Sequence, residues 1–123
     1  AGELARLLGA ERGAVEADPI GHVRAAADRF GAFVLLKGAT QYVCGPSGAV
    51  ETAVPGPAWT AQAGSGDVLA GICGTLMAAG LGPRHAALAA ASLQALAATT
   101  RPGPWPPQAI AETFPEVLAS LRP

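Results

Sequence analysis

The chain has 123 residues, half of them hydrophobic, and a net charge of −1 with Lys37 as its single lysine. We expect one domain, 1–123, with a modest core, and the charge argues against a nucleic-acid binder, which normally carries a basic stripe. No run of about 18 strongly apolar residues predicts a membrane-spanning helix, and no signal peptide is indicated. Because Cys44 and Cys73 stand far apart without a CxxC motif, we interpret both as buried reduced thiols of a cytoplasmic protein.

Two helices are predicted in the first thirty residues. Residues 1–9 have the apolar spacing of a short helix that Gly9 can end, with one face made by Leu4, Leu7 and Leu8. An Asp-Pro pair then predicts the cap and first residue of a second helix, which Gly31 ends. The expected apolar stripe of this second helix consists of Ile20, Val23, Ala26, Ala27 and Phe30.

A strand and a hairpin are predicted next. Residues 33–38 are a nearly continuous apolar run, and a helix that leads into such a run is typical of a parallel α/β unit. Lys37 would lie at the carboxyl end of this strand, the edge at which open α/β sheets bind ligands. Residues 41–44 and 49–52 flank a Gly-Pro-Ser-Gly turn, which predicts an antiparallel hairpin added to the sheet.

The rest of the chain is predicted to be helical after a Pro- and Gly-rich loop over residues 54–62. Three helices are expected over 67–79, 84–99 and 108–121, separated by Gly- and Pro-rich breaks. The first of them has a small-residue face that permits close packing. The apolar side of the last one consists of Ile110, Phe114, Val117, Leu118 and Leu121. The whole order of elements indicates an α/β protein without internal repeats.

The stretch Ala63-Gly64-Ser65-Gly66-Asp67 is the strongest functional signal. Glycines allow a close approach of the backbone to a ligand, and a helix start can hold phosphate oxygens. Asp67 is then a single carboxylate beside a site that attracts anions. The stretch is neither a P-loop nor a dinucleotide fingerprint, because the required Lys and the third glycine are not at the right spacing. An ordinary loop with an acid near a helix start remains the alternative.

Three motifs of the chain resemble the ADP- or ATP-dependent NAD(P)H-hydrate dehydratases, which have a ribokinase-like fold. They are the opening Gly-Glu-Leu-Ala-Arg-Leu-Leu-Gly, the Val-Leu-Leu-Lys-Gly-Ala run that ends at Ala39, and residues 63–71. The resemblance implies a three-layer α/β sheet with flanking helices, of which this chain would be the C-terminal half. We therefore expect a piece of a longer polypeptide with a Thr-Pro-His ahead of Ala1. Ala1 itself and residues 92–95 depart from the family pattern.

The resemblance implies a repair reaction in which ADP or ATP, with Mg²⁺, phosphorylates the hydroxyl of NADH or NADPH hydrate and phosphate then leaves. By resemblance, the residues that contact the nucleotide are Lys37, Gly38, Ala39, Thr40, Gln41 and Gly66. Asp67 would contact the hydrate and accept the proton of the attacking hydroxyl. Backbone amides of Gly64, Ser65 and Gly66 would stabilise the transferred phosphoryl group. Glu3 is a further, weaker candidate for substrate binding, and no residue is assigned to the metal.

Two rival functions remain open at this point: a ribokinase-like kinase of a vitamin-precursor alcohol, and a non-catalytic nucleotide-binding module. The donor, ADP or ATP, is also open, as is an epimerase domain upstream. We expect small-molecule substrates, no nucleic acid and no membrane as partners. By resemblance, we expect a homo-oligomer, with a tetramer as the form implied.

Overall fold

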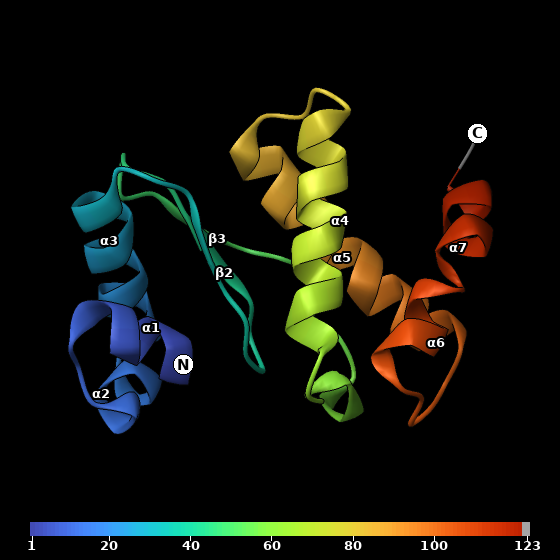
Figure 1. The fold of residues 1–123 in the computed structure, drawn as a ribbon, viewed down its shortest axis with the longest axis horizontal. Helices are drawn as coiled ribbons and strands as arrows, with labels where there is room; N and C mark the ends of the chain where they lie inside the picture. Colours follow the sequence, from blue (N-terminus) through green and yellow to red (C-terminus); the bar gives the residue numbers. More distant parts are fainter. Residues whose placement is uncertain (122–123) are drawn as a thin grey trace. The chain divides into compact units, whose positions relative to one another are not determined.

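A computed structural model describes residues 1–121 of the chain. They divide into two units, Ala1–Ala53 and Val54–Pro123 (the last two residues lie outside the description), and each unit has a hydrophobic core of its own. In Figure 1 the first unit runs from blue to green and the second from green to red.

Unit 1 begins with three helices, α1 (Gly2–Leu8), α2 (Arg12–Ala17) and α3 (Pro19–Phe30). The predicted signals around α3 are confirmed, since the Asp18 carboxylate accepts a hydrogen bond from the Gly21 amide at 2.9 Å. Gly31 ends α3 with a φ of 57°, a left-handed conformation that favours glycine. The short helix α2 was not among the sequence predictions.

The buried face of α1 differs from the predicted one. Leu4 and Ala5 are buried, with 6% and 4% of their surfaces exposed, and Leu8 packs against the same core. Leu7 is 60% exposed. The face that contains Leu4, Ala5 and Leu8 therefore contacts α2 and α3. Leu7 lies about one quarter of a turn away from this face. In α3 the stripe is narrower than predicted, since its two end members, Ile20 and Phe30, are exposed.

The sheet of unit 1 has three antiparallel strands in the order β1 (Val34–Leu36), β2 (Tyr42–Cys44) and β3 (Val50–Thr52). The β2–β3 hairpin confirms the prediction. Within residues 1–121, β1 pairs with β2 alone, so the expected parallel neighbour is not among the described strands. Leu36 lies opposite Tyr42, and residues 37–41 are consequently the loop that joins the two strands.

The core of unit 1 forms where α3 packs on β1 and β2 and where α1 and α2 pack on α3. It is built from apolar side chains of every helix and of two strands. Its buried members are Leu4, Ala5, Val15, Val23, Ala26, Ala27, Leu36 and Cys44. Cys44 is a free thiol with no exposed surface, whereas Cys73 in unit 2 is free and only half-buried.

Unit 2 consists of helices around α5 (Pro83–Thr100), which contacts α4 (Ser65–Ala78), α6 (Pro107–Ala111) and α7 (Phe114–Ser120). The loop over 54–62 is irregular as predicted, except for one 3-10 turn, η1 (Ala58–Thr60). Alanine lines much of the buried side of α5, which permits close helix contacts. The small core of this unit combines Ala97, Ile110 and Val117 with Trp59, Leu93 and Phe114.

The predicted single helix over 108–121 is wrong, because the structure has two short helices there. Pro115 has no amide hydrogen to donate and its ring collides with a carbonyl one turn earlier in a continuous helix. The chain accordingly leaves α6 after Ala111 and starts α7 at Phe114. This break exposes Leu118 and Leu121 at 50% and 60%, so they do not belong to the buried side.

The small-residue face of α4 is exposed. A Cβ added at Gly71 or Gly74 would meet no atom within 4 Å, and Met77 is 48% exposed. No helix within the described part of the chain combines the length and the hydropathy needed to cross a bilayer.

Candidate functional site

The glycine turn lies at the start of α4, as the sequence predicts, although the helix begins at Ser65 and not at Asp67. Gly64 has a φ of 83°, a left-handed conformation in which a side chain is strained. The carbonyl of Gln62 accepts hydrogen bonds from the Ser65 amide at 3.2 Å and from the Ser65 hydroxyl at 2.7 Å. These bonds set the direction in which the chain enters the helix.

Two glutamine side chains hold this turn in place. The amide of Gln62 donates to the carbonyls of Trp59 and Trp105, both at 2.9 Å. The amide of Gln94, with 5% of its surface exposed, donates to the carbonyl of Ser65 at 2.9 Å. The sequence analysis assigned no role to either glutamine. A buried amide group makes such bonds rigid, so the first turn of α4 is held from both α5 and the preceding loop.

Asp67 is exposed in the first turn of α4 and makes no capping hydrogen bond. The amides of Gly66 and Asp67 have no backbone acceptor among residues 1–121. Gly66 and Asp67 are both exposed, and a Cβ built on Gly66 would meet nothing within 4 Å, so this side of the first turn of α4 is open. Amides at a helix start attract anions, and a carboxylate there is free to accept a proton or to bind a hydroxyl group. The arrangement fits phosphoryl-transfer chemistry.

The second predicted group, residues 37–41, forms the loop between β1 and β2 in unit 1. Lys37 is half-buried, and this burial lowers the pKa of its ammonium group below the ordinary value of 10.5. A Cβ on Gly38 would come within 3.3 Å of the Thr40 carbonyl, so the tight course of the loop favours glycine. The exposed loop residues 38–40 offer backbone groups to a ligand.

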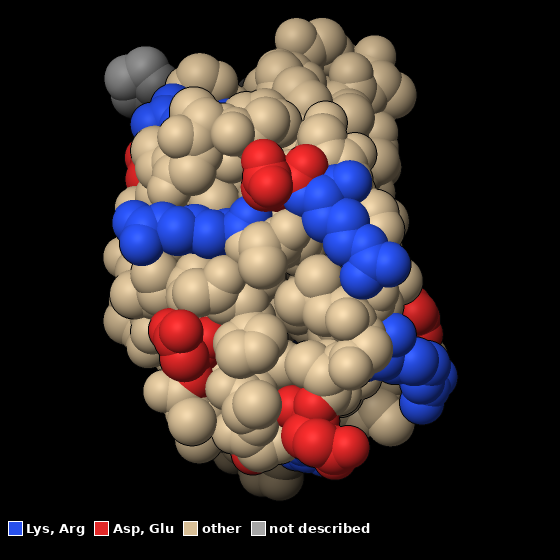
Figure 2. Space-filling model, turned by 90° about the vertical axis from the view of Figure 1, so that its left-hand side faces the viewer, with Lys and Arg blue, Asp and Glu red and all other residues tan. Residues whose placement is uncertain are grey.

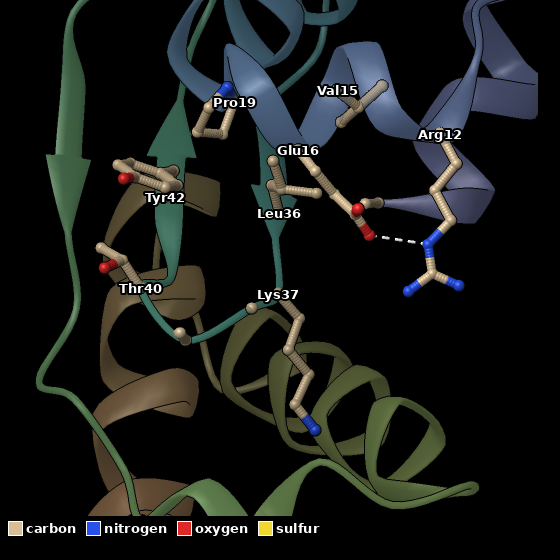
Figure 3. A pocket seen from close by; sticks show the side chains of 11 residues that line it. Arg12, Val15, Glu16, Pro19, Leu36, Lys37, Thr40 and Tyr42 are labelled. Carbon is tan, nitrogen blue, oxygen red and sulfur yellow. Dashed lines mark hydrogen bonds and ion pairs between the residues drawn. The ribbon is translucent and has the colours of Figure 1, made fainter.

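A pocket of about 410 Å³ opens beside this loop, and Figure 3 shows the side chains that line it. Four of the predicted nucleotide-binding residues belong to the lining: Lys37, Gly38, Ala39 and Thr40. Gln41 does not line the pocket; it is buried, and its side-chain oxygen has no hydrogen-bond partner among the described residues. Glu3 is exposed on α1 and also lies outside the lining.

The sequence analysis missed the wall that α2 contributes to the pocket. This wall contains Arg12, Val15 and Glu16, and the Arg12 Nε donates to the Glu16 carboxylate at 2.7 Å. In Figure 3 these residues lie on one side of Leu36, with Thr40 and Tyr42 on the other. An Arg and a Glu four residues apart were the available signal, but that spacing is common on exposed helices and does not indicate a pocket.

The described residues contain no group of three or more His, Cys, Asp or Glu side chains that could hold a metal ion. On the side that Figure 2 shows, acidic and basic side chains are scattered over a mostly uncharged surface and do not form an extended patch of one sign. An anionic ligand on this side would therefore depend on backbone amides and a few individual cations.

Comparison with known proteins adds to this geometry. A family model described as NAD(P)H-hydrate dehydratase matches residues 1–114. The chain is 48% identical over 107 residues to the bifunctional NAD(P)H-hydrate repair enzyme Nnr of Mycobacterium leprae, covering 85% of this chain and 22% of that protein. It is 45% identical over 96 residues to the ADP-dependent (S)-NAD(P)H-hydrate dehydratase of Neisseria meningitidis, covering 78% of this chain and 32% of that protein.

A solved structure also matches. The ADP/ATP-dependent NAD(P)H-hydrate dehydratase of Bacillus subtilis, co-crystallised with ATP and Mg²⁺, superposes with a TM-score of 0.89 at 21% identity, covering 98% of this chain and 46% of that one. A likeness at this identity establishes a shared fold and confirms the predicted α/β class. The chain thus spans about half of the solved chain, and a third or less of the two curated relatives.

Proposed function

Because the chain belongs to the NAD(P)H-hydrate dehydratase family, we propose that the protein carrying it uses ADP or ATP to dehydrate the hydrates of NADH and NADPH. The relatives in Mycobacterium leprae and Neisseria meningitidis, a repair enzyme and a dehydratase of NAD(P)H hydrate, support this reaction. The observation that carries the proposal is the exposed carboxylate of Asp67, which has no hydrogen-bond partner among residues 1–121, beside helix-start amides that have no backbone acceptor there.

In the proposed reaction, Asp67 accepts the proton of the substrate hydroxyl as the hydroxyl oxygen attacks the terminal phosphorus of the nucleotide, whose bond to the bridging oxygen breaks and releases ADP from ATP or AMP from ADP. A positioned general base of this kind contributes about 10²- to 10⁴-fold to a rate. The phosphorylated hydrate then loses phosphate from one ring carbon and a proton from the neighbouring carbon, which restores the double bond of the reduced nicotinamide ring. Asp67 suits the base role because no described residue accepts or donates a hydrogen bond at its carboxylate, and because its own amide and that of Gly66 have no backbone acceptor among residues 1–121.

Of the three backbone amides predicted to hold the transferred phosphoryl group, we propose that those of Gly64 and Gly66 stabilise its charge, because the Ser65 amide already donates to the Gln62 carbonyl at 3.2 Å. Support comes from the rigid hold on this turn, since donors that are already oriented need no reorganisation during the reaction. The loop residues 37–41 contact the nucleotide in this proposal, with residues 37–40 lining the pocket and Gln41 buried behind them. Glu3, exposed on α1, is retained as the weaker substrate contact.

Mg²⁺ is proposed to arrive with the nucleotide. It would neutralise charge on the phosphates when bound, and Mg²⁺ commonly uses substrate phosphates, waters and one or two carboxylates as ligands. The described residues offer no cluster that could hold the ion by themselves, so we assign no ligand to this chain.

The test uses the full-length protein that carries these residues, incubated with NADH hydrate and either ADP or ATP. Recovery of the near-ultraviolet absorbance of reduced nicotinamide is the expected result. In Asp67→Asn, turnover should fall by about 10²- to 10⁴-fold while nucleotide affinity changes little. Glu116→Gln is the matched control, because Glu116 is also an exposed acid in the first turn of a helix, α7. Equal turnover in Asp67→Asn and wild type would remove the proposed base.

The same incubations separate the rival functions. A kinase of a small alcohol would consume the nucleotide and release a phosphorylated product, while the absorbance of reduced nicotinamide would not recover. A non-catalytic nucleotide-binding module would bind ADP or ATP and turn over neither substrate. The two nucleotide arms also decide between ADP and ATP as the donor, a point on which the names of the Neisseria and Bacillus relatives differ.

We retain two further proposals from the sequence, a cytoplasmic location and a homo-oligomer in the form of a tetramer. The location follows from the two isolated cysteines, and the oligomer follows from the family resemblance. Light scattering of the full-length protein in solution gives the oligomeric state directly, and a monomeric mass at micromolar concentration would contradict the second proposal.

A further inference from the structure

We propose that Arg12 is a second cation of the nucleotide site, with its guanidinium group on the phosphates of ADP or ATP and the nucleoside at the opposite, apolar end of the same pocket. This inference rests on the proposed function and assigns a role to α2, which no sequence motif indicated. It is supported by the lining of the pocket, by the direction of the Arg12 side chain and by the hydrogen bond between Arg12 and Glu16.

The pocket has the size and the polarity that a nucleotide needs. Its volume of about 410 Å³ falls in the range of small-molecule sites. The uncharged part of the lining combines aliphatic and aromatic groups from four elements and their junctions: Val15, Pro19, Leu36 and Tyr42. The half-buried ring of Tyr42 can stack against a base.

The two cations of the lining lie at the other end of the pocket, where the Glu16 carboxylate also lines it and accepts the bond from the Arg12 Nε. Figure 3 shows that the side chains of Arg12 and Lys37 extend away from Tyr42 and Pro19. A nucleotide has the same asymmetry, with a flat, weakly polar base at one end and a polyphosphate at the other. The lining therefore favours one orientation, with the base toward Tyr42 and the phosphates toward Arg12 and Lys37.

Arg12 is already arranged for an anion. Its Nε donates to the Glu16 carboxylate at 2.7 Å, and its two terminal nitrogens have no acceptor among residues 1–121. Planar guanidinium groups bind phosphate through parallel N–H groups, so an orientation held at Nε prepares the terminal edge for such a contact. The Arg12 side chain is 74% exposed, which leaves it accessible to a ligand in the open pocket.

The experiment compares Arg12→Gln with Arg6→Gln in the full-length protein. Arg6 is an exposed arginine of the neighbouring helix α1 and does not line the pocket, so its loss controls for the change in net charge. Calorimetry would give the Kd for ADP, for ATP and for adenosine. We expect Arg12→Gln to raise the Kd for ADP and ATP by about 3- to 10-fold, as for one partly exposed charged contact, and to leave adenosine unchanged.

Two further measurements sharpen the result. The dependence of log Kd for ADP on salt should become less steep in Arg12→Gln, because one cation fewer meets the phosphates. Arg12→Lys should recover part of the affinity, since it keeps the charge and loses the planar fork.

Each other outcome has a distinct meaning. If ADP binds with the same Kd in Arg12→Gln and Arg6→Gln, the inference is overturned while the proposed function stands. If adenosine affinity falls as much as ADP affinity, Arg12 supports the pocket wall and not the phosphates, which also overturns it. If the wild-type protein binds neither ADP nor ATP, the proposed function fails together with the inference.

Discussion

The two glycines of the turn before Asp67 are expected to respond in opposite ways to the same substitution. Gly64 has a φ of 83°, and an alanine in this left-handed conformation costs about 1–2 kcal/mol. The smaller freedom of alanine in the unfolded chain returns about 0.4–1 kcal/mol. Because the nearest atom to an added Cβ, on Pro107, is 3.8 Å away, no clash adds to this sum. Gly64→Ala should therefore lower the free energy of unfolding by about 1 kcal/mol.

Gly66 lies in the first turn of α4, where its backbone is helical and an added Cβ meets no atom within 4 Å. Alanine is the better helix former by up to about 1 kcal/mol, so Gly66→Ala should leave the free energy of unfolding equal or slightly higher. The same methyl group would stand over the open amides, and turnover should fall although stability does not.

Urea unfolding of the full-length variants gives these free energies from the midpoint of the transition, provided that its slope is unchanged. Turnover is measured with NADH hydrate and nucleotide under native conditions. A Gly64→Ala variant with the same free energy of unfolding as wild type would contradict this prediction. A Gly66→Ala variant that is less stable than wild type but has the same turnover would contradict it as well. Either result would mean that the conformation of the turn differs from the one described.

Two other predictions concern the residues around the proposed site. Burial lowers the pKa of Lys37 below 10.5. At a pH between the lowered value and 10.5, the folded protein has released a proton that the unfolded chain retains, so its free energy of unfolding should rise with pH relative to that of Lys37→Gln. Over the same pH range the affinity for ADP should fall in the wild type and not in Lys37→Gln. Gln94→Leu removes the buried hydrogen bond to the Ser65 carbonyl and should lower the free energy of unfolding by about 1–2 kcal/mol. Gln108→Leu is the control, because Gln108 is exposed and its loss should not change this free energy. Equal urea midpoints for the two variants would contradict the supporting role of Gln94.

Local signals in the sequence predicted most of the elements. The Asp-Pro cap and Gly31 mark the two ends of α3, because both act through the backbone of their own neighbourhood. The Gly-rich turn over 45–48 likewise predicted the β2–β3 hairpin. The start of α4 was predicted within two residues, and the glycine turn lies where the motif required it. Around the proposed base, Asp67, the sequence therefore predicted the glycine turn and the helix that follows it.

The wall of the pocket could not be predicted because it depends on contacts between segments that are distant in sequence. Helix α2 has six residues, includes Gly13 and has no side-chain cap, so its periodicity is too short to detect. Its contribution to the pocket arises only when α2 packs against α3 and approaches the loop after β1. The burial of Ala5 in place of Leu7 has the same origin, since tertiary packing selects the contact face.

The hydrogen bonds from Gln62 to the carbonyls of Trp59 and Trp105 also allow the turn to be followed by tryptophan fluorescence. These are the two tryptophans of the 123 residues. Trp59 packs into the core of unit 2, whereas Trp105 is 38% exposed, with its indole N–H on the Pro102 carbonyl at 2.8 Å and the Arg101 guanidinium 4.1 Å above its ring. The two indole rings therefore lie in environments of different polarity, and the backbone of each tryptophan is bonded to the same glutamine, Gln62. The intrinsic fluorescence of these two tryptophans consequently reports the local order of the turn that carries Asp67, without any added label.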